Sequence, residues 1–225
     1  MNLILFDLDH TLLNGDTQYE WGRYLAYRGI INFQEYQKQM AVFDEAYHRG
    51  ALDIQKLIEF QINILKPYPL PKLHEWREEF VQERIRPLLV EAAWKTIAEH
   101  KNQGDELILI TATNEFLTTP IVKLLGIKHL IAPQEEYDAE GNLTGHFCGV
   151  PSYREGKVTR VQQWLQEEKR TWEDYEKVWF YSDSHNDIPL LSLVDYPIVV
   201  NPDSKLQEHA LKKQWKIVDF GIKRG

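Results

Sequence analysis

The feature that most constrains the fold is an apolar run near the start of the chain, followed at once by two acids. Leu3-Ile4-Leu5-Phe6 directly precedes Asp7, and Asp9 follows one residue later. Four consecutive apolar residues predict a strand buried on both faces, as in a parallel sheet. Buried carboxylates are costly unless they are paired or bound to a metal. Because ligands of open α/β sheets bind at the carboxyl ends of the strands, the two acids predict a polar site there.

The spacing of these acids suggests a division of labour. Alternate residues of an extended chain point the same way, so we expect Asp7 and Asp9 to face one ligand. One carboxylate can attack an electrophile while the other transfers a proton, and a divalent cation would offset their repulsion. Thr11 would add a hydroxyl to the same pocket. The structural alternative is an Asp-rich turn in which Asp9 caps the segment that follows.

Downstream of residue 87, short apolar runs alternate with amphipathic stretches. We predict strands at 107–110, 128–132, 178–181, 197–200 and 215–218. We predict helices at 88–100, 114–125, 154–168, 188–193 and 204–213, and a glycine-tipped hairpin turn at 137–143. Alternation of β and α predicts a mostly parallel, doubly wound sheet.

Residues 16–86 carry only helical patterns. We expect a helix around Trp21, a second at 33–47, a third beginning after Asp53, and a fourth that ends before Pro87. This segment has the size of a small helical bundle. We therefore predict an α/β core domain formed by 1–15 and 87–225, and an inserted all-helical domain formed by 16–86.

Composition narrows the class of protein. With 34 acidic and 26 basic residues the net charge is −8, which disfavours nucleic acids and anionic membranes as partners. Cys148 is the only cysteine, so no internal disulfide can form, and we expect a small, half-buried side chain in a reducing compartment. We find neither a secretory leader nor an apolar run that could span a bilayer. We expect a cytoplasmic monomer or homodimer.

Three further polar segments occupy corresponding places. Thr111-Ala112-Thr113-Asn114 follows a predicted strand, where hydroxyls and backbone amides suit phosphate oxygens; the alternative is an ordinary helix cap by Thr113 or Asn114. Lys157 begins a predicted helix, where a lysine is ordinarily solvated. The segment 182–187 adds two acids at a strand end, and such hard oxygen ligands suit Mg²⁺; the alternative is an Asp-rich turn that caps the next helix.

Together these segments resemble the four motifs of the haloacid dehalogenase superfamily. Phe6-Asp7-Leu8-Asp9-His10-Thr11-Leu12 resembles motif I, a hydrophobic strand followed by D-x-D-x-T. Thr111 matches motif II, Lys157 matches motif III, and 182–187 resembles motif IV of the phosphoserine-phosphatase-like branch, with Ser182 in place of its usual glycine. The helical insert resembles the C1 cap of subfamily IB, and the hairpin resembles its small flap. The resemblance covers nearly the whole chain.

The resemblance implies a Mg²⁺-dependent phosphomonoesterase that acts on a small molecule through an aspartyl-phosphate. Asp7 would attack phosphorus, and Asp9 would protonate the leaving group and then deprotonate a water molecule. The implied metal ligands are Asp7, Asp183 and the backbone carbonyl of Asp9. The implied phosphate-binding residues are Thr111, Ala112 and Lys157. The implied supporting residues are Thr11, Asn186 and Asp187.

The resemblance also suggests a substrate. Phosphoserine phosphatases carry an acid shortly after motif I and a cap arginine that binds the substrate carboxylate; Asp16 and Gln61 occupy these positions here. Glutamine lacks the charged fork that a carboxylate prefers, which favours a substrate with an amine and no carboxylate. Histidinol phosphate fits, with Asp16, Glu20 and Glu59 near its ammonium and imidazole. Alternatively, Gln61 is only a half-buried polar residue.

Three rival functions stay open. Phosphoserine phosphatases and phosphotransferases of the same family share every motif. A non-catalytic receiver-like module would use Asp7 only as a phosphoacceptor. Such a module needs neither a second acid such as Asp9 nor a large helical insert, so we disfavour it.

Overall fold

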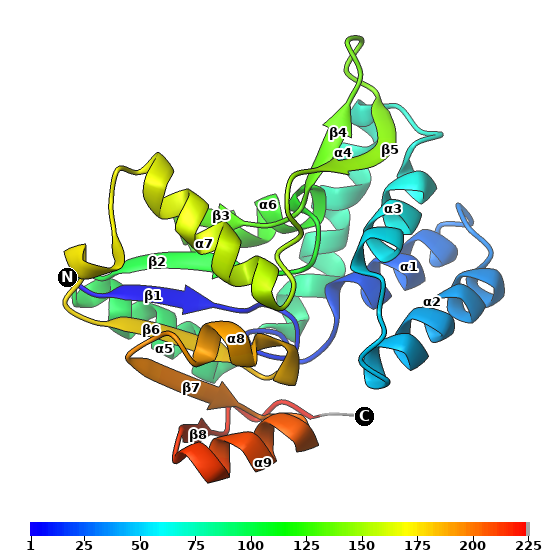
Figure 1. Cartoon of the computed structure of the whole chain (residues 1–225). Coiled ribbons are helices and arrows are strands. Elements are labelled where there is room, and N and C mark those ends of the chain that lie inside the picture. The colour runs from blue at the N-terminus through cyan, green and yellow to red at the C-terminus, as the bar shows by residue number, and fades with distance from the viewer. Residues whose placement is uncertain (224–225) are drawn as a thin grey trace.

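The computed structural model describes residues 1–223 and, at position 48, the backbone alone. Its centre is a six-stranded sheet in the order β3-β2-β1-β6-β7-β8, with every neighbouring pair parallel. The strands are β1 Leu3–Phe6, β2 Glu106–Ile110, β3 His129–Ile131, β6 Val178–Ser182, β7 Tyr196–Val200 and β8 Lys216–Val218. The predicted doubly wound parallel sheet is therefore confirmed, and Figure 1 shows it flanked by helices on both faces.

The apolar run at the start of the chain forms the centre of this sheet. All four residues of β1 are fully buried between β2 and β6. Ile4 and Phe6 pack into one hydrophobic cluster, whereas Leu3 and Leu5 pack into a second cluster. This alternation follows from the pleat of a strand. Since the strand order reverses at β1, the crevice beyond its carboxyl end is the expected place for a ligand.

Nine α-helices lie within the described residues. They are α1 Thr17–Tyr27, α2 Phe33–His48, α3 Ile54–Leu65, α4 Leu70–Phe80, α5 Glu91–Asn102, α6 Glu115–Leu125, α7 Glu155–Glu167, α8 Ile188–Leu191 and α9 Ser204–Lys213. Helices α5 and α6 contribute to the cluster of Phe6, and α7, α8 and α9 contribute to the cluster of Leu5. None of the helices in the described part of the chain is both long and apolar enough to cross a membrane.

The fourth helix ends before Pro87, as predicted. Helix α4 ends at Phe80 and is followed by a π-helical turn, Val81–Ile85, and by a separate 3₁₀ turn, Arg86–Leu88, that contains the proline. Proline is tolerated in the first turn of a helix because the N–H that it lacks has no intrahelical partner there. The next helix, predicted from residue 88, begins at Glu91, because Leu89 is extended and forms a bridge with Leu13.

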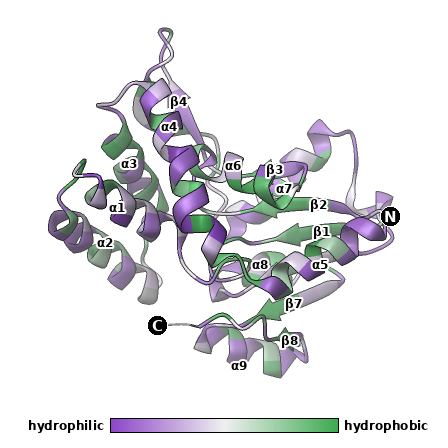
Figure 2. Cartoon of the chain, turned by 180° about the vertical axis from the view of Figure 1, so that it is seen from behind, coloured by the Kyte–Doolittle hydropathy of each residue, from purple (hydrophilic) through white to green (hydrophobic). Residues whose placement is uncertain are grey.

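Helices α1 to α4 all lie between β1 and β2 in the chain, as the helical pattern predicted. Figure 1 shows α1, α2 and α3 beyond the carboxyl ends of the strands. In Figure 2 the central strands are hydrophobic, whereas α2 carries long hydrophilic stretches. Trp21, Ile62 and Phe80 of this region belong to the same apolar cluster as Phe6 of the sheet. The boundary at 16–86 between cap and core therefore stays a prediction.

A two-stranded antiparallel hairpin, β4 Gln134–Tyr137 and β5 Leu143–Cys148, stands apart from the main sheet. It packs against α3, where Lys66 Nζ donates to the Thr144 carbonyl at 2.8 Å and Asn63 Nδ2 donates to the Gly145 carbonyl at 3.2 Å. The hairpin was predicted from its glycine-containing turn. The expectation that Cys148 is half-buried is wrong: this residue ends a strand of the isolated hairpin and is exposed.

Candidate active site

Asp7 lies directly beyond the carboxyl end of β1. Its backbone N–H donates to the Tyr181 carbonyl at 3.0 Å, which extends the pairing with β6 by one residue. The residue is only 7% exposed, and its carboxylate accepts a hydrogen bond from Lys157. Burial raises the pKa of Asp7 to about 6; Lys157 opposes this shift, whereas Asp187 and Asp9 add to it. The apolar strand therefore delivers a carboxylate whose negative charge is poorly stabilised by the protein alone.

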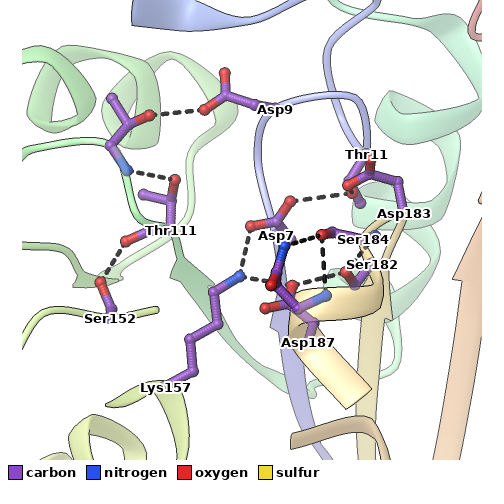
Figure 3. Close-up of polar contacts among 12 residues, drawn as sticks. Asp7, Asp9, Thr11, Thr111, Ser152, Lys157, Ser182, Asp183, Ser184 and Asp187 are labelled. Atoms are coloured by element: carbon purple, nitrogen blue, oxygen red, sulfur yellow. Dashed lines mark hydrogen bonds and ion pairs between the residues drawn. The ribbon is translucent and has the colours of Figure 1, made fainter. Parts of the chain in front are cut away.

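Lys157, in the first turn of α7, joins two carboxylates (Figure 3). Its Nζ lies 2.7 Å from Asp7 Oδ1 and 2.7 Å from Asp187 Oδ2, and the residue is 3% exposed. Burial alone would lower the pKa of Lys157, but the carboxylates of Asp187 and Asp7 outweigh burial and raise it. The ammonium is therefore charged, and the alternative of a solvated lysine is excluded. The preceding residue must be Gly156, because a Cβ there would lie 2.0 Å from the Pro151 carbonyl oxygen.

Asp9 is held apart from this ion pair (Figure 3). Its Oδ1 accepts from the Thr17 backbone at 2.6 Å and from the Thr17 hydroxyl at 2.5 Å, and its Oδ2 accepts from the Thr113 hydroxyl at 2.7 Å. Burial and then the neighbouring Asp16 raise the pKa of Asp9 to about 6, although these hydrogen bonds oppose the shift. A carboxyl group that titrates near neutral pH suits proton transfer. Asp9 also stabilises the start of α1 through its contacts with Thr17, as the alternative of a capping role for Asp9 predicted.

Thr11 links Asp7 to motif IV. Its hydroxyl lies 3.2 Å from Asp7 Oδ2 and 3.0 Å from Asp183 Oδ1. Asp7, Asp9, Asp183 and Asp187 thus line one cavity, and Lys157 pairs with two of them, Asp7 and Asp187. Among residues 1–223 no three His, Cys, Asp or Glu side chains converge on a preformed metal position. Mg²⁺ generally binds one or two carboxylates together with waters and phosphate oxygens, so these residues fit that ion.

The other residues of motif IV brace the loop. Asp187 Oδ2 accepts from the Ser182 hydroxyl at 2.7 Å, so the serine that replaces the family's glycine supports an acid of the site. Asn186 Oδ1 accepts from Arg154 Nε at 2.7 Å and from the Tyr153 hydroxyl at 3.1 Å. Motif IV is therefore connected to the segment that leads into α7.

Motif II lines the site and adds less predictable contacts. Thr111 is buried, and its hydroxyl accepts from the Thr113 backbone at 3.1 Å, while its carbonyl accepts from Ser152. The cap of α6 is Asn114, whose side chain accepts from the Leu117 backbone at 3.0 Å. Of the two predicted cap candidates, Asn114 therefore caps the helix, and Thr113 contacts Asp9 instead.

These groups surround a cavity of about 590 Å³ between the sheet and the helical insert. The predicted site residues that line it are Asp7, Asp9, Asp16, Thr111, Ala112, Lys157, Asp183, Asn186 and Asp187. Helix α2 closes part of the cavity, and its Tyr47 hydroxyl lies 2.7 Å from Ser184 Oγ. The volume is that of a small-molecule site.

The three predicted specificity residues lie in different places. Asp16 lines the cavity and caps α1 by accepting from the Tyr19 backbone at 2.7 Å, and burial raises its pKa. Glu20 does not line the cavity, and its carboxylate lies 2.9 Å from Arg23 NH1. Gln61 is buried, as its position on the apolar stripe of α3 indicated, but it lines a separate small cavity.

Sequence analysis missed several contributors. Thr17 and Tyr47 belong to no motif. Tyr47 contacts Ser184, which is distant in the sequence, whereas Thr17 contacts Asp9 through a turn that the sequence does not specify. Gln18, which lines both cavities, directly follows Thr17 but resembles any polar residue at the start of a helix. Only its position two residues after Asp16 could have drawn attention to it.

The fold and the site define a family. A model of the haloacid dehalogenase-like hydrolase family matches residues 4–192, and the chain belongs to this family. It is 41% identical over 219 residues to the histidinol-phosphatase of Neisseria meningitidis serogroup C (strain 8013), covering 97% of this chain and 99% of that protein. It is 28% identical to the phosphoserine phosphatase SerB1 of Mycobacterium tuberculosis (strain ATCC 25618 / H37Rv), covering 97% of this chain and 71% of the relative.

A solved structure is equally similar over its length. The crystal structure of a protein of unknown function from Bordetella pertussis Tohama I superimposes with a TM-score of 0.91 at 41% identity. The match covers 97% of this chain and 98% of that one. The predicted family of hydrolases is confirmed.

Proposed function

We propose that the protein is a Mg²⁺-dependent phosphomonoesterase that hydrolyses histidinol phosphate through an aspartyl-phosphate intermediate. The observation that carries this proposal is the placement of Asp7. Its carboxylate lines a cavity of metabolite size and is paired with Lys157. Asp9 lines the same cavity, but its carboxyl group lies in different surroundings. Two acids in distinct environments can act as nucleophile and as proton carrier.

The first half-reaction transfers the phosphoryl group to the enzyme. A carboxylate oxygen of Asp7 attacks phosphorus, the bond from phosphorus to the ester oxygen breaks, and Asp9 donates its proton to the leaving alkoxide. Thr111, Ala112 and Lys157 contact the non-bridging phosphate oxygens, where phosphoryl transfer needs positive charge and hydrogen-bond donors. Mg²⁺, held by Asp7, Asp183 and the Asp9 carbonyl, would supply further charge neutralisation.

The second half-reaction regenerates the enzyme. Asp9, now ionised, takes a proton from a water molecule that attacks phosphorus, and the bond from phosphorus to Asp7 breaks. Inorganic phosphate leaves, and Asp9 is again protonated. Thr17 and Thr113 keep the Asp9 carboxyl group in place during both steps. Thr11, Asn186 and Asp187 stabilise the loops around Asp7.

The substrate assignment rests on the 41% identical histidinol-phosphatase and on the cap-side residues. Asp16 lines the cavity beside Asp9 and would bind the ammonium group of the substrate. Gln61 offers no positive charge to a carboxylate. Glu20 would act at longer range, since it does not line the cavity. Phosphoserine is the second candidate, favoured by the SerB1 relative and by the same acid at Asp16.

Phosphate release from a panel of phosphomonoesters tests the proposal. The panel contains histidinol phosphate, phosphoserine and an aryl phosphate, each with Mg²⁺ and each repeated with Asp7→Asn. We expect strong preference for histidinol phosphate and no turnover by the variant. Selective hydrolysis of phosphoserine would overturn the substrate assignment. Faster transfer to added alcohols than to water would indicate a phosphotransferase, and phosphorylation of Asp7 without turnover would indicate a binding module.

Other expectations remain part of this proposal. We propose that residues 16–86 act as a cap on the core formed by 1–15 and 87–225. We also propose that the enzyme works in the cytoplasm as a monomer or homodimer, with a small phosphorylated molecule as its partner. Size-exclusion chromatography with light scattering would determine the oligomeric state.

A further inference from the structure

The end of helix α2 contacts the motif IV loop that follows β6. The Tyr47 hydroxyl lies 2.7 Å from Ser184 Oγ, and the rings of Tyr47 and His185 meet edge to face with their centroids 5.8 Å apart. Burial raises the pKa of Tyr47 above its usual range, so its hydroxyl stays protonated and neutral. The helical insert therefore forms a polar contact with a loop that lines the catalytic cavity.

A second connection between α2 and this loop runs through Arg154, which directly precedes α7. Its NH1 donates to the Gly50 carbonyl at 3.3 Å, in the turn after α2, and its Nε donates to Asn186 Oδ1 at 2.7 Å. The Arg154 backbone has a φ of 51° and a ψ of −125°, a conformation that favours glycine. Strained residues of this kind are held by surrounding contacts and are frequent at functional sites.

Both connections meet at the side chain of Asn186. Its Oδ1 accepts from Arg154, and its Nδ2 lies 3.4 Å from Ser184 Oγ, the atom that Tyr47 contacts. The Asn186 backbone N–H also donates to Ser184 Oγ, at 3.2 Å. Asn186 is only 4% exposed, so its contacts with the protein determine its orientation. The end of α2 thus acts on one buried side chain by two routes.

The loop that contains Asn186 carries two acids of the catalytic cavity. Asp183 directly precedes Ser184. Asp187 directly follows Asn186, and its Oδ2 lies 2.7 Å from Lys157 Nζ (Figure 3). A rotation of this loop would displace both acids and the ammonium group from the reacting phosphate, and a misplacement of about 1 Å can slow a reaction about 10²-fold. The contacts made by α2 can therefore affect the chemical step.

We propose that Tyr47 and Arg154 are positioning residues that fix motif IV in its reactive arrangement. Tyr47 acts through Ser184, and Arg154 acts through Asn186. The helical insert then contributes to phosphoryl transfer as well as to the wall of the cavity. This inference rests on the proposed function, because it assumes that motif IV serves an aspartyl-phosphate reaction, but it holds for any phosphomonoester substrate.

Tyr47→Phe tests the proposal, because it keeps the ring that packs on His185 and removes only the hydroxyl. We expect kcat to fall about tenfold, the factor that one good hydrogen bond contributes, with KM unchanged. Since Tyr47 also lines the cavity, direct contact with the substrate is the competing explanation. Histidinol phosphate and an aryl phosphate share only the phosphoryl group, so a positioning role predicts the same fall in kcat for both.

A double-mutant cycle with Ser184→Ala tests the route of this effect. Both changes remove the same contact, so the double variant should be no slower than the slower single variant. Arg154→Gly suits the backbone conformation, removes the guanidinium group, and should also lower kcat without a change in KM. Tyr24→Phe is the matched control: the Tyr24 hydroxyl lies 2.7 Å from Glu79 Oε2 within the insert and does not line the cavity, so kcat should not change.

Three outcomes would overturn the positioning role. A fall confined to histidinol phosphate, or a rise in KM, would show that Tyr47 binds the substrate. Losses that multiply in the double variant would show that Tyr47 does not act through Ser184. A lower melting temperature with unchanged kcat would show that the contact only stabilises the fold. Wild-type enzyme that releases phosphate from no phosphomonoester would instead overturn the proposed function, and the positioning role with it.

Discussion

The catalytic cavity and the small cavity lined by Gln61 are neighbours, but their polar atoms are satisfied in different ways. In the catalytic cavity Asp7 is paired with Lys157, and Asp9 is bonded to Thr17 and Thr113. In the small cavity the amide of Gln61 has no partner among the described residues. The first cavity takes its reactive groups mainly from strand ends of the sheet, and the second is lined mainly by inserted helices. The difference indicates that the chain pairs its reactive groups itself, whereas the small cavity, at about 10 Å³, has room for about one water molecule to satisfy Gln61.

The largest effect is expected from Asp7→Asn. An amide cannot form the aspartyl-phosphate, so phosphate release should fall by about 10⁴-fold or more. Because burial raises the pKa of Asp7 to about 6, its ionised form is destabilising at pH 7, and the neutral variant should melt no lower than wild type. Activity assays and thermal unfolding at pH 7 measure both. A folded variant with substantial turnover would show that Asp7 is not the nucleophile.

Lys157→Met should lower both activity and stability. It leaves Asp7 and Asp187 buried without their ammonium partner, and loss of one member of a buried ion pair costs about 3–5 kcal/mol. We expect turnover to fall by about 10²–10³-fold, as when a donor to a transition-state oxygen is removed. Urea unfolding and phosphate release provide the measurements.

The matched control for this change is Lys212→Met. Lys212 also pairs with an acid, Glu208, but both side chains are 70% exposed, and such pairs contribute about 0–1 kcal/mol. A similar loss of stability in the two variants would contradict the difference in environment. Stability that is unchanged in Lys157→Met would show that the acids of the catalytic cavity are not held by this lysine.

Local patterns and the family resemblance together predicted the reactive side of this comparison. The apolar run before Asp7 indicated a buried central strand, whereas Lys157 at a helix start was assigned to the site only by the resemblance. The opposite side depends on distant contacts. Helical periodicity indicated that Gln61 is buried, but only the packing of α3 against α1 and α6 reveals that its amide lacks a partner. Cys148 was mispredicted because composition does not reveal that its strand lies outside the main sheet.

Glu135→Gln tests a third kind of buried polar group. The Glu135 side chain in β4 is buried, and its Oε1 accepts from the Phe116 backbone at 3.0 Å. Burial raises the pKa of Glu135 from 4.5 to about 7. The folded state therefore holds this proton more tightly than the unfolded state, and stability falls as the pH rises from about 4.5 to 7.

The glutamine variant lacks this titration and still offers an acceptor to Phe116. Its free energy of unfolding should match that of wild type near pH 4.5 and exceed it at pH 8 by about 2 kcal/mol, somewhat less than the full shift implies. Urea unfolding of both proteins from pH 4.5 to 8 checks the sign. A variant that is less stable at pH 8 would mean that the ionised carboxylate is stabilised in the fold.

The smallest effect is expected where the hairpin joins α3 of the helical insert. Gly145 has a φ of 96° and lies against Asn63 of α3; a Cβ at Gly145 would be 2.5 Å from Asn63 Oδ1. Gly145→Ala should therefore strain the backbone and also displace the hairpin from α3. Gly141→Ala is the control, because Gly141 has a φ of 83° but no neighbouring atom within 4 Å of an added Cβ.

The difference between these two variants isolates the contact with Asn63. Gly145→Ala should lose about 1 kcal/mol more stability than Gly141→Ala, and adding Asn63→Ala should recover much of that difference. Equal losses of stability in Gly145→Ala and Gly141→Ala would show that the contact with Asn63 does not hold the hairpin against α3.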